Sequence, residues 1–425
     1  MTVPDAHQTI RAIFRSESPR LIAGLTRLLR DVGRAEELAQ DALVAALEQW
    51  PVSGLPDKPG AWLMATAQHR AINQLRHCKM AERKHVELAG QAQQRSADDV
   101  ADELVTQIDD DVGDDLLRLI FIACHPVLPT EARVALTLRL IGGLTTGEIA
   151  RAFLLPEPTI AQRIVRAKRT LAEKQVPFEV PRAAELGARL ASVLEVVYLI
   201  FNEGYSATAG DDLLRPALCE DAQRLGRILA ELAPDEPEVH GLLAVMEINA
   251  SRLAARTDAA GEPILLLDQD RSRWDTPLIR RGLEELEHAE LLGGAKGPYA
   301  LLAAITACHA RAQTAAETDW ARIAALYGDL LEVWPSPVVA LNRAVAVGMA
   351  EGPAAGLALI DQLGESPALA SYALLPSARA DLLAKLGRNG EARAEFERAA
   401  ALTQNARQRA RLLERARLLE GAEAR

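Results

Sequence analysis

The spacing of apolar and polar positions predicts helices along most of the chain. Apolar residues recur with helical spacing over 7–84 and again over 116–174. From residue 183 onward the same spacing continues in helices joined by short turns, apart from a longer irregular stretch at 257–276. Strand-like runs of β-branched and aromatic residues are scarce. The sequence therefore predicts an all-α protein.

Polar stretches and prolines divide this helical pattern into parts. We predict a first helical domain over 1–85, an acidic linker over 86–113 and a second helical domain over 114–176. Prolines at 177 and 181 mark a further boundary, after which residues 183–425 form a long helical domain. The linker buries little apolar surface, which favours a solvated segment. The alternative is that its carboxylates mimic phosphates and cover a basic face until they are displaced.

The C-terminal part contains an internal similarity. One segment echoes another at an offset of roughly 36 residues, close to the ~34 of a tetratricopeptide repeat. The first segment is 342–346 with Ala355 and Leu359, and the second is 378–383 with Ala392 and Phe396. Small residues at these positions allow the two helices of a hairpin to approach closely. We predict helical-hairpin repeats, with a plain helical bundle as the alternative.

Composition supports the helical prediction and limits the partners. The chain is 49% hydrophobic, 25% charged and 4% aromatic, a mixture that favours helices. The formal net charge of −11 argues against a surface that binds nucleic acid everywhere, although local basic faces remain possible. The four cysteines form no CxxC pair, so neither a disulfide framework nor a zinc ribbon is indicated.

The termini and the apolar runs indicate the compartment. The N-terminus has no basic-then-apolar leader, and no apolar run approaches the ~20 residues of a membrane span. We therefore expect a cytoplasmic protein with no membrane partner.

The sharpest local signal is a helix-turn-helix pattern. Gly142 and Gly143 can end one helix, and Thr145 with Glu148 forms a capping box that begins the next. After a short turn, Pro158 lies where a first-turn proline is tolerated, and a longer helix continues to about residue 171. A short helix, a tight turn and a second helix are typical of a helix-turn-helix.

The second of these helices has two distinct faces. Its inward positions are Ile160, Ile164, Ala167 and Leu171. Its outward positions are Thr159, Gln162, Arg163, Arg166 and Arg169. Guanidinium groups contact phosphates and guanine edges and Gln contacts adenine, so this face suits the major groove. The alternative is an ordinary amphipathic helix with solvated arginines.

A second basic helix is predicted over 58–76. Pro59 can begin it, and its inner positions are Leu63, Ala67, Ala71 and Leu75. The candidate binding residues are Trp62, Arg70, Asn73 and Arg76. An aromatic side chain combined with cations suits unpaired bases and backbone phosphate. A solvated amphipathic helix is again the alternative.

Several patterns suggest other chemistry without completing it. Asp268, Asp270 and Ser272 alternate as in a calcium loop, but Arg273 occupies the glycine position and Ile279 the glutamate position. We interpret this segment as a loop anchored by Trp274 and buried ion pairs. The spacing of His77, Cys78 and His85 matches no standard zinc site, and Glu203 at a helix end is a weak candidate acid. No GxGxxG, P-loop or GxSxG motif is present, so we expect no enzyme activity, cofactor or metal.

The order of these parts resembles the extracytoplasmic-function (ECF) branch of bacterial sigma factors. The matching segments are DVGRAEELAQDALVAALEQWP, KPGAWLMATAQHRAINQLRH and PTEARVALTLRLIGGLTTGEIARAFLLPEPTIAQRIVRAKRTL. In that family they correspond to a helix that docks on the clamp of the polymerase largest subunit, a helix that melts and recognises the minus-10 element, and the region 4 helix-turn-helix that recognises the minus-35 element. The resemblance implies that the docking residues are Glu36, Glu37, Asp41 and Glu48. It also implies that the partners are core RNA polymerase, through its clamp and flap, and promoter DNA.

The remainder of the chain resembles the long C-terminal extension of one sigma subgroup. The segments YLIFNEGYSATAG, DQDRSRWD and PSPVVALNRAVAV carry this resemblance. It implies a tetratricopeptide-like domain that regulates or assists the sigma regions, with a possible intramolecular contact. The alternative hypothesis is a helix-turn-helix regulator that binds an operator without polymerase and uses the repeats for ligand binding or dimerisation. An interaction scaffold is a weaker alternative, because both predicted DNA faces retain their basic residues.

Overall fold

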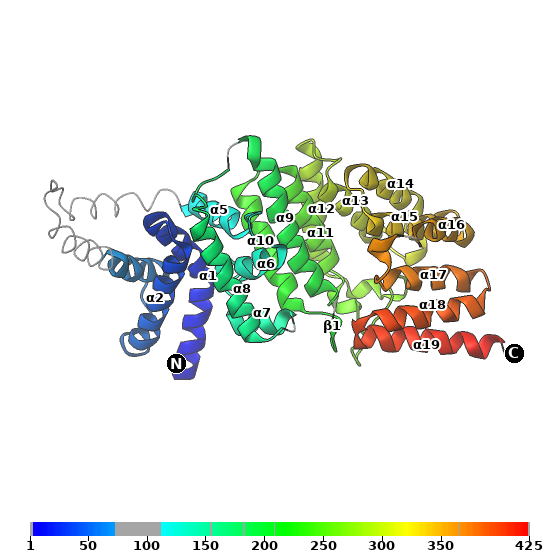
Figure 1. Cartoon of the computed structure of the whole chain (residues 1–425), viewed down its shortest axis with the longest axis horizontal. Helices are drawn as coiled ribbons and strands as arrows, with labels where there is room; N and C mark the ends of the chain where they lie inside the picture. Colours follow the sequence, from blue (N-terminus) through cyan, green and yellow to red (C-terminus); the bar gives the residue numbers. More distant parts are fainter. Residues whose placement is uncertain are drawn as a thin grey trace. The chain divides into compact units, whose positions relative to one another are not determined.

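The computed structural model of the chain describes residues 3–72, 112–153, 155–181, 183–207, 209–364 and 366–423. The predicted all-α class is confirmed, because almost every described element is a helix (Figure 1). The strands among these residues are one two-residue parallel pair, Ala209–Gly210 (β1) with Gln404–Asn405 (β2). In the same ranges, no helix has the length and apolar character needed to cross a bilayer. The acidic linker predicted at 86–113 lies almost wholly outside the described residues.

The chain divides into two compact units, 1–196 and 197–425. Both domains predicted in the N-terminal part therefore belong to one unit. The boundary falls inside a helix, α9 (Ala183–Tyr205), rather than at the prolines where the sequence placed it.

The N-terminal unit is a helical bundle. It contains α1 (Val3–Leu29), α2 (Val32–Ser53), a helix with described residues 59–72, α5 (Val112–Ala123), α6 (Thr130–Leu140), α7 (Thr146–Phe153), α8 (Glu157–Glu173) and the first part of α9. Helix α1 packs against both α2 and α5, so elements on the two sides of the predicted linker share one core. Leu21, Leu25, Leu38 and Leu119 are fully buried there.

The C-terminal unit is a succession of helices packed on their neighbours. After the end of α9 come α10 (Pro216–Leu232), α11 (Pro237–Ala250), α12 (Thr276–Leu291), α13 (Pro298–Arg311), α14 (Trp320–Val333), α15 (Pro337–Ala350), α16 (Pro353–Leu363), α17 (Leu374–Lys385), α18 (Asn389–Leu402) and α19 (Ala406–Glu423). Among the described residues of this unit, five short 3₁₀ turns lie between the helices, at 253–255, 266–268, 271–273, 315–317 and 367–369. Consecutive helices pack against each other along the chain, as in a stack of hairpins.

Local capping explains where these helices begin. Proline occupies a first-turn position in α8, α10, α11, α12, α13, α15 and α16, where its missing N–H costs nothing. Aspartates cap three helices by accepting backbone N–H bonds: Asp31 from Arg34 at 3.0 Å, Asp275 from Leu278 at 2.9 Å and Asp319 from Arg322 at 2.8 Å. The helix starts are therefore encoded locally in the sequence.

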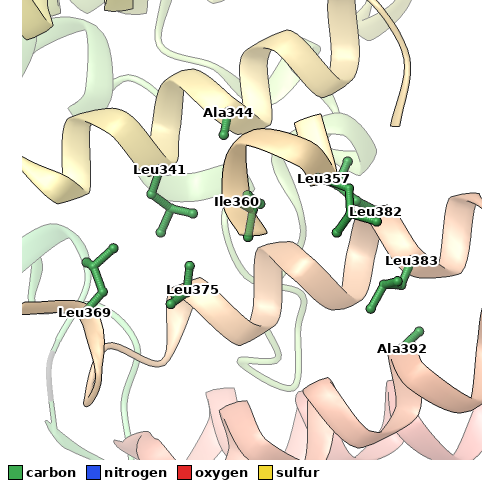
Figure 2. Close-up of a cluster of buried hydrophobic side chains, with 9 residues drawn as sticks. All are labelled: Leu341, Ala344, Leu357, Ile360, Leu369, Leu375, Leu382, Leu383 and Ala392. Carbon is green, nitrogen blue, oxygen red and sulfur yellow. The ribbon is translucent and has the colours of Figure 1, made fainter. Parts of the chain in front are cut away.

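The predicted helical hairpins are present near the C-terminus. Within the first, a Cβ on Gly356 would lie 2.7 Å from the Cα of Gly348, so only glycine permits this crossing of α15 and α16. The repeat positions Ala344, Ala380, Ala392 and Phe396 are all buried. A cluster of leucines between α15, α16, α17 and α18 joins the two hairpins (Figure 2). That the hairpins are of the tetratricopeptide kind stays a prediction.

Within the irregular stretch before α12, the loop at 268–275 is anchored by Trp274, as predicted, whereas no ion pair among the described residues involves this loop. The ion pair of the stretch joins Glu262 to Arg407 at 2.9 Å, outside the loop. Trp274 is buried, and the guanidinium carbons of Arg271 and Arg252 lie 4.7 and 5.7 Å from its ring centroid. Arg271 also donates a 2.7 Å hydrogen bond to the carbonyl of Ala312. The carboxylate of Asp270 accepts hydrogen bonds from the backbone N–H and the hydroxyl of Ser272, and therefore caps this turn. Among the described residues no cluster of His, Cys, Asp and Glu could hold a metal ion.

Candidate nucleic-acid interface

The helix-turn-helix forms from the capping box that the sequence predicted. The backbone N–H of Thr145 donates to Glu148 Oε2 at 2.7 Å, and the backbone N–H of Glu148 donates back to Thr145 Oγ1 at 3.2 Å. Gly143, with φ of 66°, provides the left-handed turn that ends the preceding helix. Together these residues fix where α6 ends and where α7 begins.

Helix α8 has the two faces expected from its sequence. Its buried residues are Ile160, Ile164, Ala167 and Leu171, which are the predicted inward positions. Thr159, Gln162, Arg166 and Arg169 are exposed, and Arg163 is half-buried. An open groove of about 450 Å³ runs beside this face, lined by four of the candidate residues and by residues 128–132 around the start of α6. The structure thus groups Thr159, Gln162, Arg163 and Arg166 on one surface.

Arg169 differs from the other candidates on α8. Its Nε donates to Glu173 Oε1 at 2.6 Å, one helical turn further along, and this contact raises the pKa of the guanidinium. Both side chains are exposed, so the pair is weak and can exchange for a phosphate. Arg169 therefore lies on the candidate surface with a local partner already in place.

On the basic helix at 59–72, two of the side chains predicted to bind DNA, Trp62 and Arg70, already contact other residues of the protein. The ring of Trp62 lies edge-on to the buried Trp50, with centroids 5.2 Å apart, so one edge of Trp62 is used in packing. Arg70 forms an ion pair with Asp41 at 3.5 Å. Arg70, predicted to bind DNA, is therefore paired with Asp41, predicted to bind polymerase. Asn73 and Arg76 lie outside the described residues, as do the histidine and cysteine positions at 77, 78 and 85.

The acidic residues of α2 separate into two groups. Glu37, Asp41 and Glu48 are exposed, as a docking surface requires. Glu36 is 4% exposed and its carboxylate pairs with Arg139 of α6 at 2.6 Å and with Lys168 of α8. The predicted role of Glu36 in docking does not fit this position, because its carboxylate is buried inside the unit and joins α2 to the helix-turn-helix.

The spacing of α2 contained a signal for this burial. Val32, Ala35 and Ala39 form a buried stripe, and Glu36 lies within it at helical spacing, whereas Glu37 and Asp41 point to the other side. The partners Arg139 and Lys168 gave no such signal, because they lie more than a hundred residues further along the chain.

The start of α9 packs against α6 and the end of α5 in the N-terminal unit. Arg189 donates to the carbonyl of Phe121 at 2.7 Å, and Ser192 Oγ donates to the carbonyl of Cys124 at 2.7 Å. Arg133 of α6 pairs with Glu195 at 3.1 Å. These contacts explain why the unit extends to residue 196 and not to the prolines. Burial in this interface raises the pKa of the Cys124 thiol to about 11, so this cysteine stays protonated.

Comparison with known proteins identifies three segments of the chain. Sigma-70 region 2 matches residues 13–79, and Sigma-70 region 4 matches residues 118–171. A family of unknown function, DUF6596, matches residues 189–290. The first two segments contain every residue that the sequence predicted to contact DNA or polymerase, and the third begins within α9.

Relatives of the chain fall into two groups. The ECF RNA polymerase sigma factor SigK of Mycobacterium tuberculosis (strain ATCC 25618 / H37Rv) is 31% identical over 169 residues, covering 39% of this chain and 84% of SigK. SigK of Mycobacterium ulcerans (strain Agy99) is 28% identical over 165 residues, covering 38% and 82%. An uncharacterized protein of Rhizobium meliloti (strain 1021) is 42% identical over 392 residues, covering 92% of this chain and 91% of that protein. The similarity to SigK of Mycobacterium tuberculosis thus covers 39% of this chain, whereas the similarity to the Rhizobium protein covers 92% of it.

Proposed function

This chain belongs to the family of ECF RNA polymerase sigma factors, and we propose from this premise how its own residues divide the work of promoter selection. A sigma factor directs core RNA polymerase to promoters and initiates transcription there. The family does not favour the alternative of an operator-binding regulator that acts without polymerase. The natural site of action is the cytoplasm, where core polymerase and the chromosome meet.

Helix α8 is the element that contacts the minus-35 duplex. The observation that supports this role is the shared surface of Gln162, Arg163 and Arg166 beside an open groove. Guanidinium and amide groups on the N-terminal half of a recognition helix can contact base edges, while further cations contact phosphate. Thr159 and Arg169 lie at the two ends of the same surface and contact backbone phosphates.

Helix α2 binds the polymerase, and the helix at 59–72 binds the opened DNA strand. The exposed carboxylates of Glu37, Asp41 and Glu48 form the docking surface for the clamp of the largest subunit. Trp62 and Arg70, followed by Asn73 and Arg76 further along the sequence, contact the unpaired minus-10 strand. Region 4 also contacts the flap. Because Arg70 pairs with Asp41 at 3.5 Å, the docking and strand-binding surfaces adjoin each other.

Run-off transcription tests this assignment. The full chain with core RNA polymerase should yield transcripts from specific promoters of the host genome. The double variant Arg163→Ala/Arg166→Ala should lose at least ~10-fold of that yield, because each base-edge contact contributes about 1–3 kcal/mol of discrimination. The matched control, Arg280→Ala/Arg417→Ala, removes the same charge from exposed positions on α12 and α19 and should transcribe normally. Sequence-specific DNA binding by the chain alone, with no transcript from the holoenzyme, would contradict the proposal.

The C-terminal unit regulates or assists the sigma regions. The support is its extent, 197–425, and the Rhizobium relative that shares this architecture over most of its length. A chain truncated after residue 196 keeps the contacts by which Arg189, Ser192 and Glu195 hold the start of α9 to the rest of the N-terminal unit. Its transcript yield should differ from that of the full chain by at least ~5-fold, the lower range of typical couplings between sites. Equal yields from the two proteins would refute a regulatory role.

A further inference from the structure

The C-terminal unit contains a cavity with an unusual balance of charge. It is open to solvent and has a volume of about 360 Å³, between the end of α9, the irregular stretch before α12, the start of α17 and the middle of α19. Arg252, Arg256, Arg411 and Arg415 line it, and no carboxylate does. In a chain with a net charge of −11, such a concentration of cations is notable. The cavity lies at the small end of the range of about 300–1,000 Å³ that ligand sites occupy.

Three of these arginines have no acidic partner in the described part of the chain. Arg415 bonds to Asp381 and stacks on Phe396, so its charge is already balanced. No ion pair involves Arg252, Arg256 or Arg411 among the described residues. Cations held together without counter-charges create a positive potential that a bound anion would relieve.

The protein stacks two of these cations on aromatic rings. The guanidinium carbon of Arg256 lies 3.7 Å from the ring centroid of Tyr205, and that of Arg252 lies 5.7 Å from the centroids of both Tyr205 and Trp274. Stacking fixes the planes of the guanidinium groups without neutralising them. Arg252 is only 7% exposed and donates a hydrogen bond to Oδ1 of Asn249, a neutral partner that leaves its buried charge without a counter-charge.

Several buried polar atoms around the cavity lack hydrogen-bond partners. They are Nε of Arg252, Nε of Arg256 and Oε1 of Gln269, all on side chains that line the cavity. Such orphaned atoms are rare in folded proteins, because each costs free energy comparable to a lost hydrogen bond. Nearby His309 experiences the same field, since burial together with Arg252 and Arg271 lowers its pKa to about 4.

Much of the remaining lining is apolar, beside the polar side chains of Ser206, Gln269, Ser377 and Gln408. Leu213, Ile264, Leu265, Leu266, Leu374 and Leu412 contribute to it. Leu265 and Leu374 are 42% and 52% exposed, which is high for leucines that line a cavity. A water-filled anion site would not need this surface, whereas the body of an amphipathic molecule would cover it.

We propose that this cavity is a binding site for a small amphipathic anion, a molecule with one carboxylate or phosphate group on a short apolar body. Arg252, Arg256 and Arg411 hold the anionic group, and the leucines cover the apolar part. The site belongs to the C-terminal unit and does not depend on the role of the N-terminal unit in transcription.

Calorimetric titration of the full chain tests the site. The probes are decanoate and decyl phosphate, with decylamine and inorganic phosphate as controls for charge and for the apolar body. Decanoate or decyl phosphate should bind with one-to-one stoichiometry in the micromolar range, and the stronger of the two identifies the head group. Decylamine should not bind, and inorganic phosphate should bind far more weakly. Absence of saturable binding by both anionic amphiphiles, or equal binding of decylamine, would overturn the proposal.

Variants on α19 provide the matched comparison. Arg411→Gln removes a lining cation and should weaken binding by at least ~10-fold, because a charge-assisted hydrogen bond is lost. Arg417→Gln changes the same residue type at an exposed position of the same helix outside the cavity and should bind normally. Leu374→Glu, at an exposed lining position, should also abolish binding without affecting the fold. Equal affinities for Arg411→Gln and Arg417→Gln would place the ligand elsewhere.

Discussion

Reversing the charge of the exposed acids on α2 should abolish binding to core polymerase. The triple variant Glu37→Lys/Asp41→Lys/Glu48→Lys replaces three exposed carboxylates with cations. A basic docking partner would then face like charge, which costs several kcal/mol at a complementary interface. We expect the affinity for core polymerase to fall at least ~100-fold, with run-off transcription lost in parallel. A pull-down with core polymerase and a binding titration at two salt concentrations measure this effect.

The fold should tolerate this change. The three positions are exposed, and their one ion pair in the described residues, Asp41 with Arg70 at 3.5 Å, is a surface contact that contributes little to stability. The control reverses Glu284, Glu287 and Glu290, which lie on an exposed face of α12 and alter the net charge equally. Polymerase binding at the normal level by the α2 variant would show that docking uses another surface. Equal loss in both variants would indicate a general charge effect.

Removing the buried carboxylate of Glu36 should destabilise the N-terminal unit by about 2–3 kcal/mol. Its partners, Arg139 and Lys168, retain side-chain exposures of 18% and 22%, so both cations would be left partly buried without a counter-charge. Breaking a buried pair by removing one partner typically costs 3–5 kcal/mol, and the partial exposure here reduces that figure. Hydrogen exchange of α2, α6 and α8 amides in Glu36→Ala should accelerate accordingly.

The neighbouring residue provides the control for Glu36. Glu37→Ala changes the same side chain at an exposed position and should alter stability by no more than about 0.5 kcal/mol. Adding Arg139→Leu to Glu36→Ala should restore part of the lost stability, because the orphaned cation is removed together with its partner. If exchange in Glu36→Ala matched that in Glu37→Ala, the buried pair would not hold α2 to the helix-turn-helix.

Two features of the site show how far local sequence patterns extend. The capping box of Thr145 and Glu148 and the buried stripe of α8 appear as the sequence predicted, since both depend on residues three or four positions apart. Trp62 and Arg70 also lie on the predicted helix. Their partners, Trp50 and Asp41, come from α2, and helical spacing within 59–72 contained no information about that helix.

The sequence by itself determined the helical class, the starts of the helices and the outward surface of the recognition helix. These properties follow from short-range physics, because caps, prolines and the 3.6-residue period act within one or two turns. The tertiary structure alone decided that Glu36 pairs with Arg139 and Lys168, that α9 begins inside the N-terminal unit, and that Arg252, Arg256 and Arg411 share one cavity. Each of these arrangements joins residues far apart in the chain. Their positions depend on how whole helices pack, which no local spacing specifies.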